Sequence, residues 1–336
     1  MALLAVDNLS VKFTRRGKPD FQAVDGVSFA VSEGEVVGLV GESGCGKSVT
    51  SLALMGLLGD HGVSVGGNAT FDGIELLKLR KDAMRDLRGR DMAMIFQDPL
   101  SSLNPVVPIG IQVTEILTRH RGMRGEAARK EAADLLDRVG IPDPTRRLRE
   151  YPHQMSGGMR QRALIAMAVA CAPRLLIADE PTTALDVTIQ AQILELLKEL
   201  VDSEGTALLM ITHDLGVVAG LCDQINVLYA GKVVENAARR NLFAAPTHPY
   251  SVGLLGSIPR LDAPRGEPLT PVRGSVNDNI DWADGCAFAP RCDHYTIECL
   301  QGPPALTETY TGHGYRCVNP VIDHTAPAVS DTEANS

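Results

Sequence analysis

Short apolar runs without a polar face recur along the first 240 residues of the chain. The clearest are residues 35–40, 174–179 and 207–212, which are rich in Val, Leu and Ile. Such runs predict strands that are buried in a sheet. Residues 49–58 have the composition of a helix and follow the first run after a glycine-rich turn. A strand, a loop and a helix in this order are the start of a parallel α/β sheet.

Other segments divide the chain into parts. Residues 9–13 and 23–31 favour β-structure near the N-terminus, and residues 225–229 and 233–235 favour a closing hairpin. Residues 110–150 are instead rich in Ala, Leu, Glu, Lys and Arg at helical spacing, which predicts a helical insertion.

We therefore expect a main α/β domain over residues 1–240 with a helical subdomain at about 98–165. After about residue 240 the composition shifts to Pro, Gly, Thr and Asp and includes four cysteines, which predicts a small loop-rich domain over 241–325. Residues 326–336 are small and polar, and we expect them to be disordered.

Composition and charge exclude several kinds of protein. Of the 336 residues, 44% are hydrophobic and 22% are charged, as in a globular protein in water. The net charge is −9 and only 4% of the residues are aromatic, so no nucleic-acid partner is expected. The longest apolar stretch, residues 163–173, is shorter than the roughly 20 residues of a membrane-spanning helix, and the first residues do not resemble a signal peptide. We expect a cytosolic chain, in which disulfides are rare.

The turn after the first buried run carries a complete phosphate-binding motif. Residues 41–48 read GESGCGKS and lie between a predicted strand and a predicted helix, the context in which this Walker A motif is specific. Its glycines let backbone N–H groups approach phosphate oxygens, and the helix presents its positive N-terminus to the same anion. Lys47 is placed to neutralise the β- and γ-phosphates, and Ser48 is placed to bind Mg²⁺.

Two acidic residues, Asp179 and Glu180, follow the apolar residues 175–178. Asp179 ends the predicted strand, where its carboxylate can hold Mg²⁺ through water, and Glu180 is placed to act as general base toward the attacking water. Acidic residues after a strand often only cap a turn. The phosphate loop upstream in the same predicted sheet favours the hydrolytic role here.

A second glycine-rich cradle lies at Ser156, Gly157 and Gly158, where an Ala-rich helical run begins. A serine and two glycines at a helix start offer N–H groups to an anion. Because one ATP molecule needs only one phosphate loop, we expect the second cradle to close over the γ-phosphate that a partner chain holds. The sequence thus predicts a reciprocal dimer with ATP between two chains.

With these motifs in this order, residues 3–235 resemble the P-loop NTPase core of the ABC transporter ATPases. The family signature, usually Leu-Ser-Gly-Gly-Gln, occurs here as residues 155–159, with Met155 in place of Leu and Met159 in place of Gln. The resemblance implies that Gln97 senses Mg²⁺ and the attacking water and that His213 hydrogen-bonds the γ-phosphate. Together with Glu180, these two residues form the expected catalytic set.

The resemblance also implies which residues contact the nucleotide. An aromatic residue stacks on adenine in this family, and Phe13 is the candidate, with Phe21 as its rival. Residues 184–186 resemble the D-loop, whose aspartate reaches across the dimer. Mg²⁺ is expected at Ser48, Gln97 and Asp179. The residues expected to contact ATP are Phe13, Gly41, Ser43, Gly44, Cys45, Gly46, Lys47, Ser48, Val49, Ser156, Gly157, Gly158 and Asp186.

A closer match is to the ATPase subunits of oligopeptide and dipeptide importers. It is carried by residues 96–105 (FQDPLSSLNP), by 151–154 (YPHQ) and by 247–250 (THPY), which Leu254, Leu255 and Pro259 follow. The resemblance implies peptide import at the cytoplasmic face of the cell membrane, driven by ATP. It implies as partners a second, non-identical ATPase chain, two membrane permease subunits and an extracytoplasmic solute-binding protein.

Two other functions remain open from the sequence. Related importers of nickel or another small solute share this ATPase pattern. A soluble ABC protein of translation or DNA repair usually carries two ATPase cores or a long coiled coil, and the chain shows neither.

Four cysteines cluster in the C-terminal part, at Cys286, Cys292, Cys299 and Cys317. Thiols in a cytosolic segment too polar to build its own core suggest a metal that holds the segment together. Zinc and a [4Fe–4S] cluster use the same four ligands. The spacing lacks the Cys-x2-Cys pairs common in zinc ribbons, and the resemblance favours the cluster. Zinc and free or disulfide-bonded thiols remain the alternatives.

Cys45 lies inside the phosphate loop near the start of a helix, where the pKa of a thiol can be lowered. The hypothesis is that its alkylation blocks ATP binding. A small residue that only fills the loop is the equal alternative.

Overall fold

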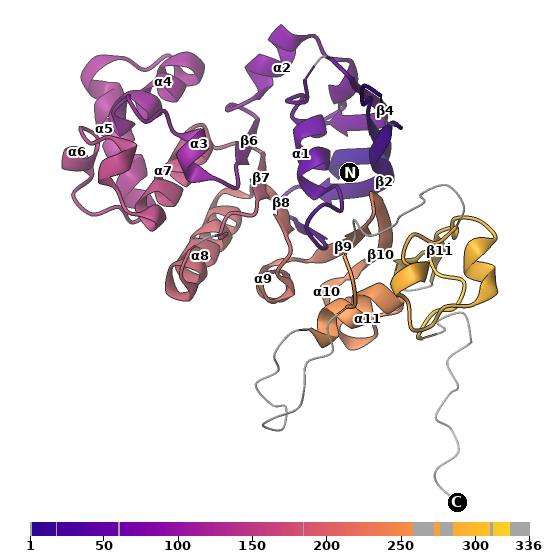
Figure 1. Cartoon of the computed structure of the whole chain (residues 1–336). Coiled ribbons are helices and arrows are strands. Elements are labelled where there is room, and N and C mark those ends of the chain that lie inside the picture. Colours follow the sequence, from indigo (N-terminus) through magenta and orange to yellow (C-terminus); the bar gives the residue numbers. More distant parts are fainter. Residues whose placement is uncertain are drawn as a thin grey trace, which may run out of the picture.

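An eight-stranded sheet forms the centre of the molecule (Figure 1). The computed structural model describes residues 2–17, 19–59, 61–183, 185–257, 272–275, 285–309 and 312–322. The strands lie in the order β11-β12-β10-β9-β3-β8-β7-β6, and their bounds are β3 Val36–Val40, β6 Met92–Ile95, β7 Leu175–Asp179, β8 Ala207–Thr212, β9 Gln224–Tyr229, β10 Lys232–Ala238, β11 Thr307–Glu308 and β12 Gly314–Tyr315. The pairs among β6, β7, β8, β3 and β9 are parallel, so the carboxyl ends of these strands share one edge.

A second, antiparallel sheet has the order β2-β1-β4-β5. Its strands are β1 Ala2–Phe13, β2 Phe21–Ser32, β4 Val63–Phe71 and β5 Ile74–Glu75. β1 and β2 extend beyond the runs predicted from the sequence. Their buried side chains alternate with exposed ones, and this alternation is a weaker sequence signal than an unbroken apolar run.

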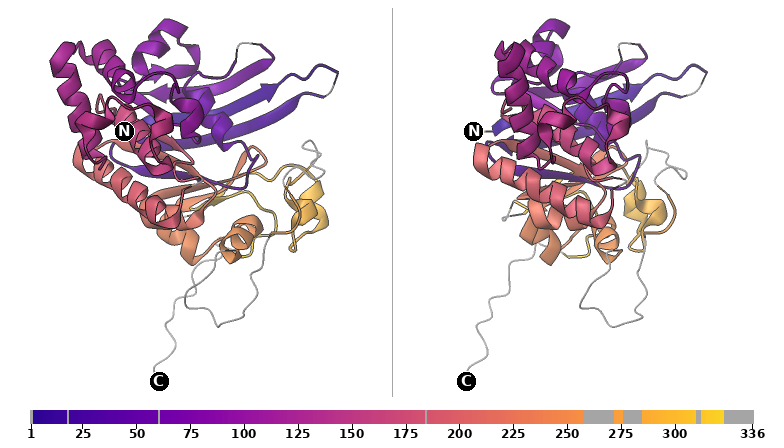
Figure 2. Two further views of the ribbon diagram at one scale, coloured as in Figure 1. Left: turned by 60° about the vertical axis from the view of Figure 1, so that its left-hand side comes forward. Right: turned by 90° about the vertical axis from the view of Figure 1, so that its left-hand side faces the viewer.

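Helices cover the sheets and form the insertion. In chain order the helical elements are α1 Lys47–Leu54, η1 Leu76–Lys78, α2 Lys81–Leu87, α3 Pro99–Ser102, α4 Ile109–Arg121, α5 Gly125–Arg138, α6 Pro144–Arg147, η2 Pro152–Gln154, α7 Gly157–Val169, α8 Val187–Glu204, α9 Leu215–Leu221, α10 Arg239–Ala244, α11 Pro249–Gly256, η3 Ala289–Arg291 and η4 Ile297–Leu300. α3 to α7 lie together beyond the β6 end of the central sheet (Figures 1 and 2). No helix in the described ranges has the length and apolar character to cross a membrane.

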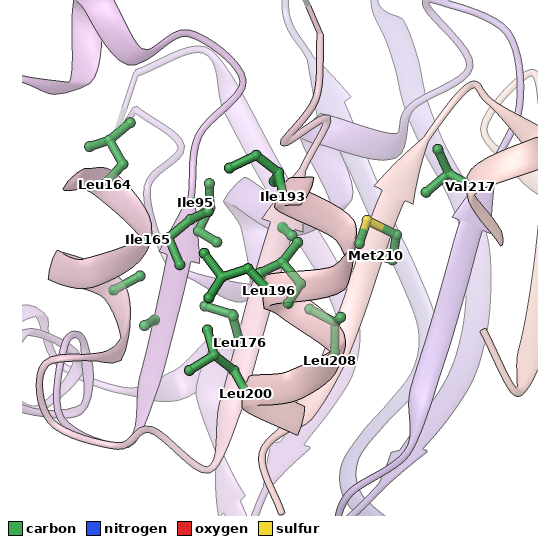
Figure 3. Packing of buried hydrophobic residues seen from close by; sticks show 14 of the residues in the cluster. Ile95, Leu164, Ile165, Leu176, Ile193, Leu196, Leu200, Leu208, Met210 and Val217 are labelled. Carbon is green, nitrogen blue, oxygen red and sulfur yellow. The ribbon is translucent and has the colours of Figure 1, made fainter. Parts of the chain in front are cut away.

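The core consists of two clusters of buried side chains. One packs α7 and α8 onto β6, β7 and β8 through residues such as Ile165, Leu176 and Leu196 (Figure 3). The other lies between the two sheets and includes α1.

The structure bears on several predicted elements. The strands predicted at 35–40, 174–179 and 207–212 are present as β3, β7 and β8, and the hairpin is present as β9 and β10. The helix predicted at 49–58 is present as α1, but its predicted C-terminal end is wrong. It stops at Leu54, because Gly56 takes a positive φ of 57° and ends the helical path. Ala184, Pro259 and residues 326–336 lie outside the described ranges.

Candidate nucleotide site

The phosphate loop joins the carboxyl end of β3 to the start of α1. All five residues of β3 are buried, which fixes the point where the loop begins. Gly46 caps α1 with φ 104°, and a side chain there would clash with the carbonyl oxygen of Ala23. The glycine is therefore required by both the backbone conformation and the close approach of β2. Ser43 and Gly44 lie exposed at the tip of the loop, and Val49 is half-buried in α1.

Lys47 is the cation of this loop. Its side chain is buried, and Nζ donates hydrogen bonds to the carbonyl oxygens of Gly41 at 2.6 Å and Glu42 at 3.0 Å. These contacts hold the ammonium group within the loop, where phosphate oxygens would replace the carbonyl groups.

The expectation of a low pKa for Cys45 is wrong. The side chain is fully buried, and burial raises the pKa of the thiol more than the nearby Lys47 lowers it. Of the two hypotheses for Cys45, the structure favours the second, in which its small side chain only fills space in the loop.

Ser48 and Asp179 meet at the carboxyl edge of the central sheet. Ser48 Oγ donates a hydrogen bond to Asp179 Oδ1 at 3.0 Å. Asp179 ends β7 and is buried, and burial raises the pKa of its carboxyl group above the ordinary value. A cation favours the charged form of such a group. A hydroxyl beside a carboxylate is the donor set that Mg²⁺ takes in P-loop sites.

Glu180 is the centre of a hydrogen-bonded cluster. Its Oε2 accepts from Gln97 Nε2 at 3.0 Å and from Thr183 Oγ1 at 2.8 Å, and its Oε1 lies 3.1 Å from His213 Nδ1. The structure thus joins the three predicted catalytic residues. Sequence analysis missed Thr183, whose only signal was its place three residues after the acid.

The backbone and the charge of Glu180 are both unusual. Its φ is 47°, in the left-handed region that non-glycine residues rarely occupy, and such strain is typical of functional sites. Burial alone would raise the pKa of Glu180, but hydrogen bonds from Thr183 and His213 outweigh it and lower the pKa below the ordinary value. The side chain is therefore a carboxylate at neutral pH, as a general base must be.

The Ser156 cradle lies in a different part of the chain. Ser156 caps α7, and its hydroxyl accepts from the N–H of Met159 at 3.3 Å. Side chains at Gly157 and Gly158 would meet Leu185 and Ile189, so the cradle packs on the start of α8, which Asp186 caps. In the described ranges no hydrogen bond or ion pair connects residues 156–158 with residues 41–48, and Figure 1 shows α7 among the insertion helices, apart from α1.

Phe13 and its rival Phe21 are direct neighbours. Phe13 ends β1 and pairs with Phe21 at the start of β2. The guanidinium of Arg15 lies 4.3 Å from the centre of the Phe21 ring, which covers that ring with a cation. Phe13 is half-buried against the core between the two sheets.

Glu235 on β10 anchors the C-terminal part. Its side chain is completely buried and accepts hydrogen bonds from the N–H groups of Thr247 at 2.7 Å and His248 at 2.9 Å. His313 Nε2 lies 2.6 Å from the same carboxylate. Burial alone would raise the pKa of Glu235, but the contact with His313 and the further hydrogen bonds lower it.

The four C-terminal cysteines line one small cavity of about 10 Å³, together with His248, Pro249, Phe288, Ala289, His294, Pro304 and Val318. All four are free thiols, and burial raises the pKa of Cys317 to about 12. No three metal-binding side chains among the described residues are arranged to hold a metal ion. His248 Nδ1 accepts from the N–H of Tyr250, so its buried Nε2 carries the proton, and this Nε2 has no partner.

Comparisons with known proteins agree with this geometry. The model of the ABC transporter family matches residues 24–183, and that of the oligopeptide/dipeptide transporter C-terminal region matches residues 234–299. The chain is 51% identical over 316 residues to the dipeptide transport ATP-binding protein DppD of Bacillus subtilis, with 94% of each chain covered. It is 49% identical over 319 residues to the oligopeptide transport ATP-binding protein OppD of Salmonella typhimurium, covering 95% of this chain and 94% of the relative. The dimeric, post-hydrolysis structure of the ATP-binding cassette MJ0796 with ADP and Pi matches with a TM-score of 0.64 and 30% identity, over 70% of this chain and 99% of that one.

Proposed function

The chain belongs to the ABC transporter family as an ATP-binding subunit of the dipeptide and oligopeptide importers, and we propose that it hydrolyses ATP at sites shared with a second ATPase chain. ATP hydrolysis by this subunit is coupled to peptide transport. The observation that carries the proposal is the separation of two anion cradles. Residues 41–48 lie beside Glu180, whereas residues 156–158 lie on α7, away from both.

The roles at the site follow from its contacts. Lys47 neutralises the β- and γ-phosphates, and Ser48 and Asp179 would hold Mg²⁺, whose charge would assist the same neutralisation. Glu180 takes a proton from the attacking water as the water oxygen bonds to the γ-phosphorus and the bond to the ADP oxygen breaks. Gln97 and His213 orient the water and the γ-phosphate, because both already contact the Glu180 carboxylate.

Further roles complete the shared site. Phe13 stacks on the adenine, since the ring of Phe21 is covered by Arg15. Ser156 and the N–H groups at Gly157 and Gly158 close over the γ-phosphate of the partner. Asp186 reaches the partner from the start of α8.

The assembly that we propose has several parts. ABC ATPases dimerise and associate with the permease components of such transporters. Here the second ATPase is a non-identical chain, and the pair acts on two permease subunits and a solute-binding protein at the cytoplasmic face of the cell membrane. The ATPase domain extends over residues 1–240, with the helical subdomain at about 98–165, and the C-terminal extension follows.

A helix-preserving variant tests the shared site. Ser156→Asp keeps a good cap for α7 but directs a negative charge at the partner's γ-phosphate. In a Glu180→Gln background, we expect ATP to trap the dimer with the second ATPase chain, and adding Ser156→Asp should abolish trapping while ATP binding by the single chain persists. Size-exclusion chromatography with ATP measures this. A trapped dimer in the double variant would contradict the shared site.

We also propose that Cys286, Cys292, Cys299 and Cys317 hold a [4Fe–4S] cluster. Four thiols around one cavity are the right donors, and the buried His248 ring lines the same cavity. A single zinc ion takes the same four thiolates and is the alternative occupant. A cluster would take one thiolate from each of the four cysteines. Its role would be to stabilise the extension.

Metal analysis decides between these sites. We expect an anaerobic preparation to be brown, to contain about four irons per chain, and to lose both with Cys292→Ser. Cys171→Ser, a half-buried cysteine outside the cavity, is the matched control and should retain the colour. A colourless preparation with one zinc per chain would refute the cluster.

A further inference from the structure

Glu42, the second residue of the phosphate loop, is held by two side chains from the C-terminal part. Arg291 Nη1 donates to Glu42 Oε2 at 2.6 Å and Nη2 donates to Oε1 at 2.9 Å, a paired contact across 249 residues of sequence. The N–H of Glu42 donates to the hydroxyl of Tyr250 at 2.9 Å. Both the carboxylate and the backbone of this loop residue are thus fixed from outside the ATPase core.

The ion pair is well shielded from solvent. The Arg291 side chain is 7% exposed and that of Glu42 is 28% exposed. The guanidinium lies 5.6 Å from the centre of the Tyr229 ring and 5.9 Å from that of Phe288. Tyr250 packs against the same two rings. A paired charge in such surroundings is much less screened than one on the surface.

The residues that hold Glu42 also border the cysteine cavity. Arg291 ends η3 within the turn from Cys286 to Cys292, and this turn is closed by hydrogen bonds from the N–H of Ala289 to Cys286 and from the N–H of Cys292 to Ala289. Tyr250 is two residues from His248, which lines the cavity. One rigid turn therefore carries both a cavity thiol and the cation that reaches the phosphate loop.

We propose that Arg291 is a positioning residue for ATP binding, which couples the turn from Cys286 to Cys292 to the phosphate loop by neutralising and holding Glu42. The proposal rests on the ATP site assigned above. Without Arg291, the Glu42 carboxylate would add an unpaired negative charge to the loop that binds a triphosphate. The carbonyl group of Glu42 also accepts from Lys47, so a displaced Glu42 disturbs the ammonium group as well.

A double-mutant cycle tests the route through Glu42. We expect Arg291→Gln to raise the Kd for ATP about tenfold, equal to about 1.4 kcal/mol, while kcat at saturating ATP falls less than twofold. Glu42→Gln added to Arg291→Gln should recover at least half of the lost affinity, because the unpaired charge is gone. Arg291→Lys, which keeps the charge, should lose less affinity than Arg291→Gln. Arg240→Gln is the control, since it removes the same charge from an exposed side chain on α10.

The outcomes separate positioning from a merely structural role. If Arg291 only stabilises the fold, Arg291→Gln should lower the unfolding temperature and the amount of active protein without changing the Kd of the active fraction, and the second substitution should add damage. Equal affinity in wild type and Arg291→Gln, or no recovery in the double variant, would overturn the proposal. If Lys47→Ala binds ATP as tightly as the wild type, the assigned ATP site itself is wrong, which separates its failure from that of the role of Arg291.

The coupling to the cysteines has its own readout. Cys292→Ser should raise the Kd for ATP at least threefold in the wild-type background and should have no further effect when Glu42 and Arg291 are both replaced by glutamine. An unchanged Kd in Cys292→Ser would overturn the coupling. Iron and zinc contents are measured on the same samples. A chain without metal would refute the cluster. The effect of Arg291→Gln on the Kd for ATP would still test the positioning role of Arg291.

Discussion

Replacing Glu180 by glutamine separates ATP binding from hydrolysis, because the local geometry accommodates the amide. The carbonyl oxygen of the new side chain can take the place of Oε2 and accept from Gln97 and Thr183, as the carboxylate does at 3.0 and 2.8 Å. The amide NH₂ then takes the place of Oε1 and faces His213 Nδ1, which can accept when the imidazole proton is on Nε2. All three contacts survive, and only the ability to take a proton is lost.

The size of the effect follows from this comparison. A positioned general base contributes about 10²- to 10⁴-fold to a rate, which corresponds to about 3–5 kcal/mol of activation free energy. Because the three hydrogen bonds are kept, we expect the Kd for ATP to change less than about threefold, below 1 kcal/mol. Replacing this one carboxylate oxygen by an NH₂ group should thus lower the rate of hydrolysis strongly and change the Kd for ATP little.

Phosphate release and ATP binding by the complete transporter complex measure the two quantities. Glu195→Gln, a glutamate exposed on α8, makes the same chemical change outside the site and should leave turnover at the wild-type level. A rate in Glu180→Gln above one tenth of the wild-type rate would exclude Glu180 as the base. Equal losses of binding and turnover would show that the contacts to Gln97 and Thr183 had not been preserved.

Three further predictions test other parts of the molecule. Cys45 should react with iodoacetamide much more slowly than half-buried Cys171 at neutral pH, because burial raises its pKa and blocks access; mass spectrometry that finds Cys45 modified first would contradict this. Gly46→Ala should abolish binding of a fluorescent ATP analogue without unfolding the chain, since the new methyl group clashes with the carbonyl group of Ala23; retained binding would show that the loop can adapt. Glu235 has a lowered pKa in the folded chain, so its stabilisation is complete above the unfolded value near 4.5 and is lost as the pH falls through the folded pKa. Glu235→Gln should cost about 2–3 kcal/mol at pH 7 and flatten the loss of stability in acid; thermal unfolding with the same pH dependence in both proteins would refute this.

Sequence could predict those features that are determined locally. The phosphate loop needs only a buried strand, three suitably placed glycines and the next helix, all within residues 36–54. The signature likewise needs a serine that caps α7 and a glycine at Gly158, where Ile189 leaves no room for a side chain. Each of these requirements is visible as a short spacing in the chain.

Sequence could not predict contacts that depend on how distant segments pack. Thr183 joins Glu180 only because of the backbone path after β7, and a threonine there has no distinguishing pattern. Arg291 pairs with Glu42 across 249 residues, and the local sequence around neither residue predicts this ion pair. The low pKa expected for Cys45 failed for a similar reason, since the helix start was visible in the sequence and the complete burial of the thiol was not.

The amino-acid composition changes near residue 240, where we expect the domain boundary. Hydrogen bonds and an ion pair nevertheless connect the extension to the core across this boundary. Beyond α11, the extension has two strands of two residues each and short helical turns in its described parts, which is too little apolar surface for a fold of its own. Its position therefore depends on contacts with the core, at the buried Glu235 carboxylate and at the Arg291 ion pair. Because one of these attachment points is the phosphate loop itself, we expect a rearrangement of the turn from Cys286 to Cys292 to reach Glu42 through Arg291.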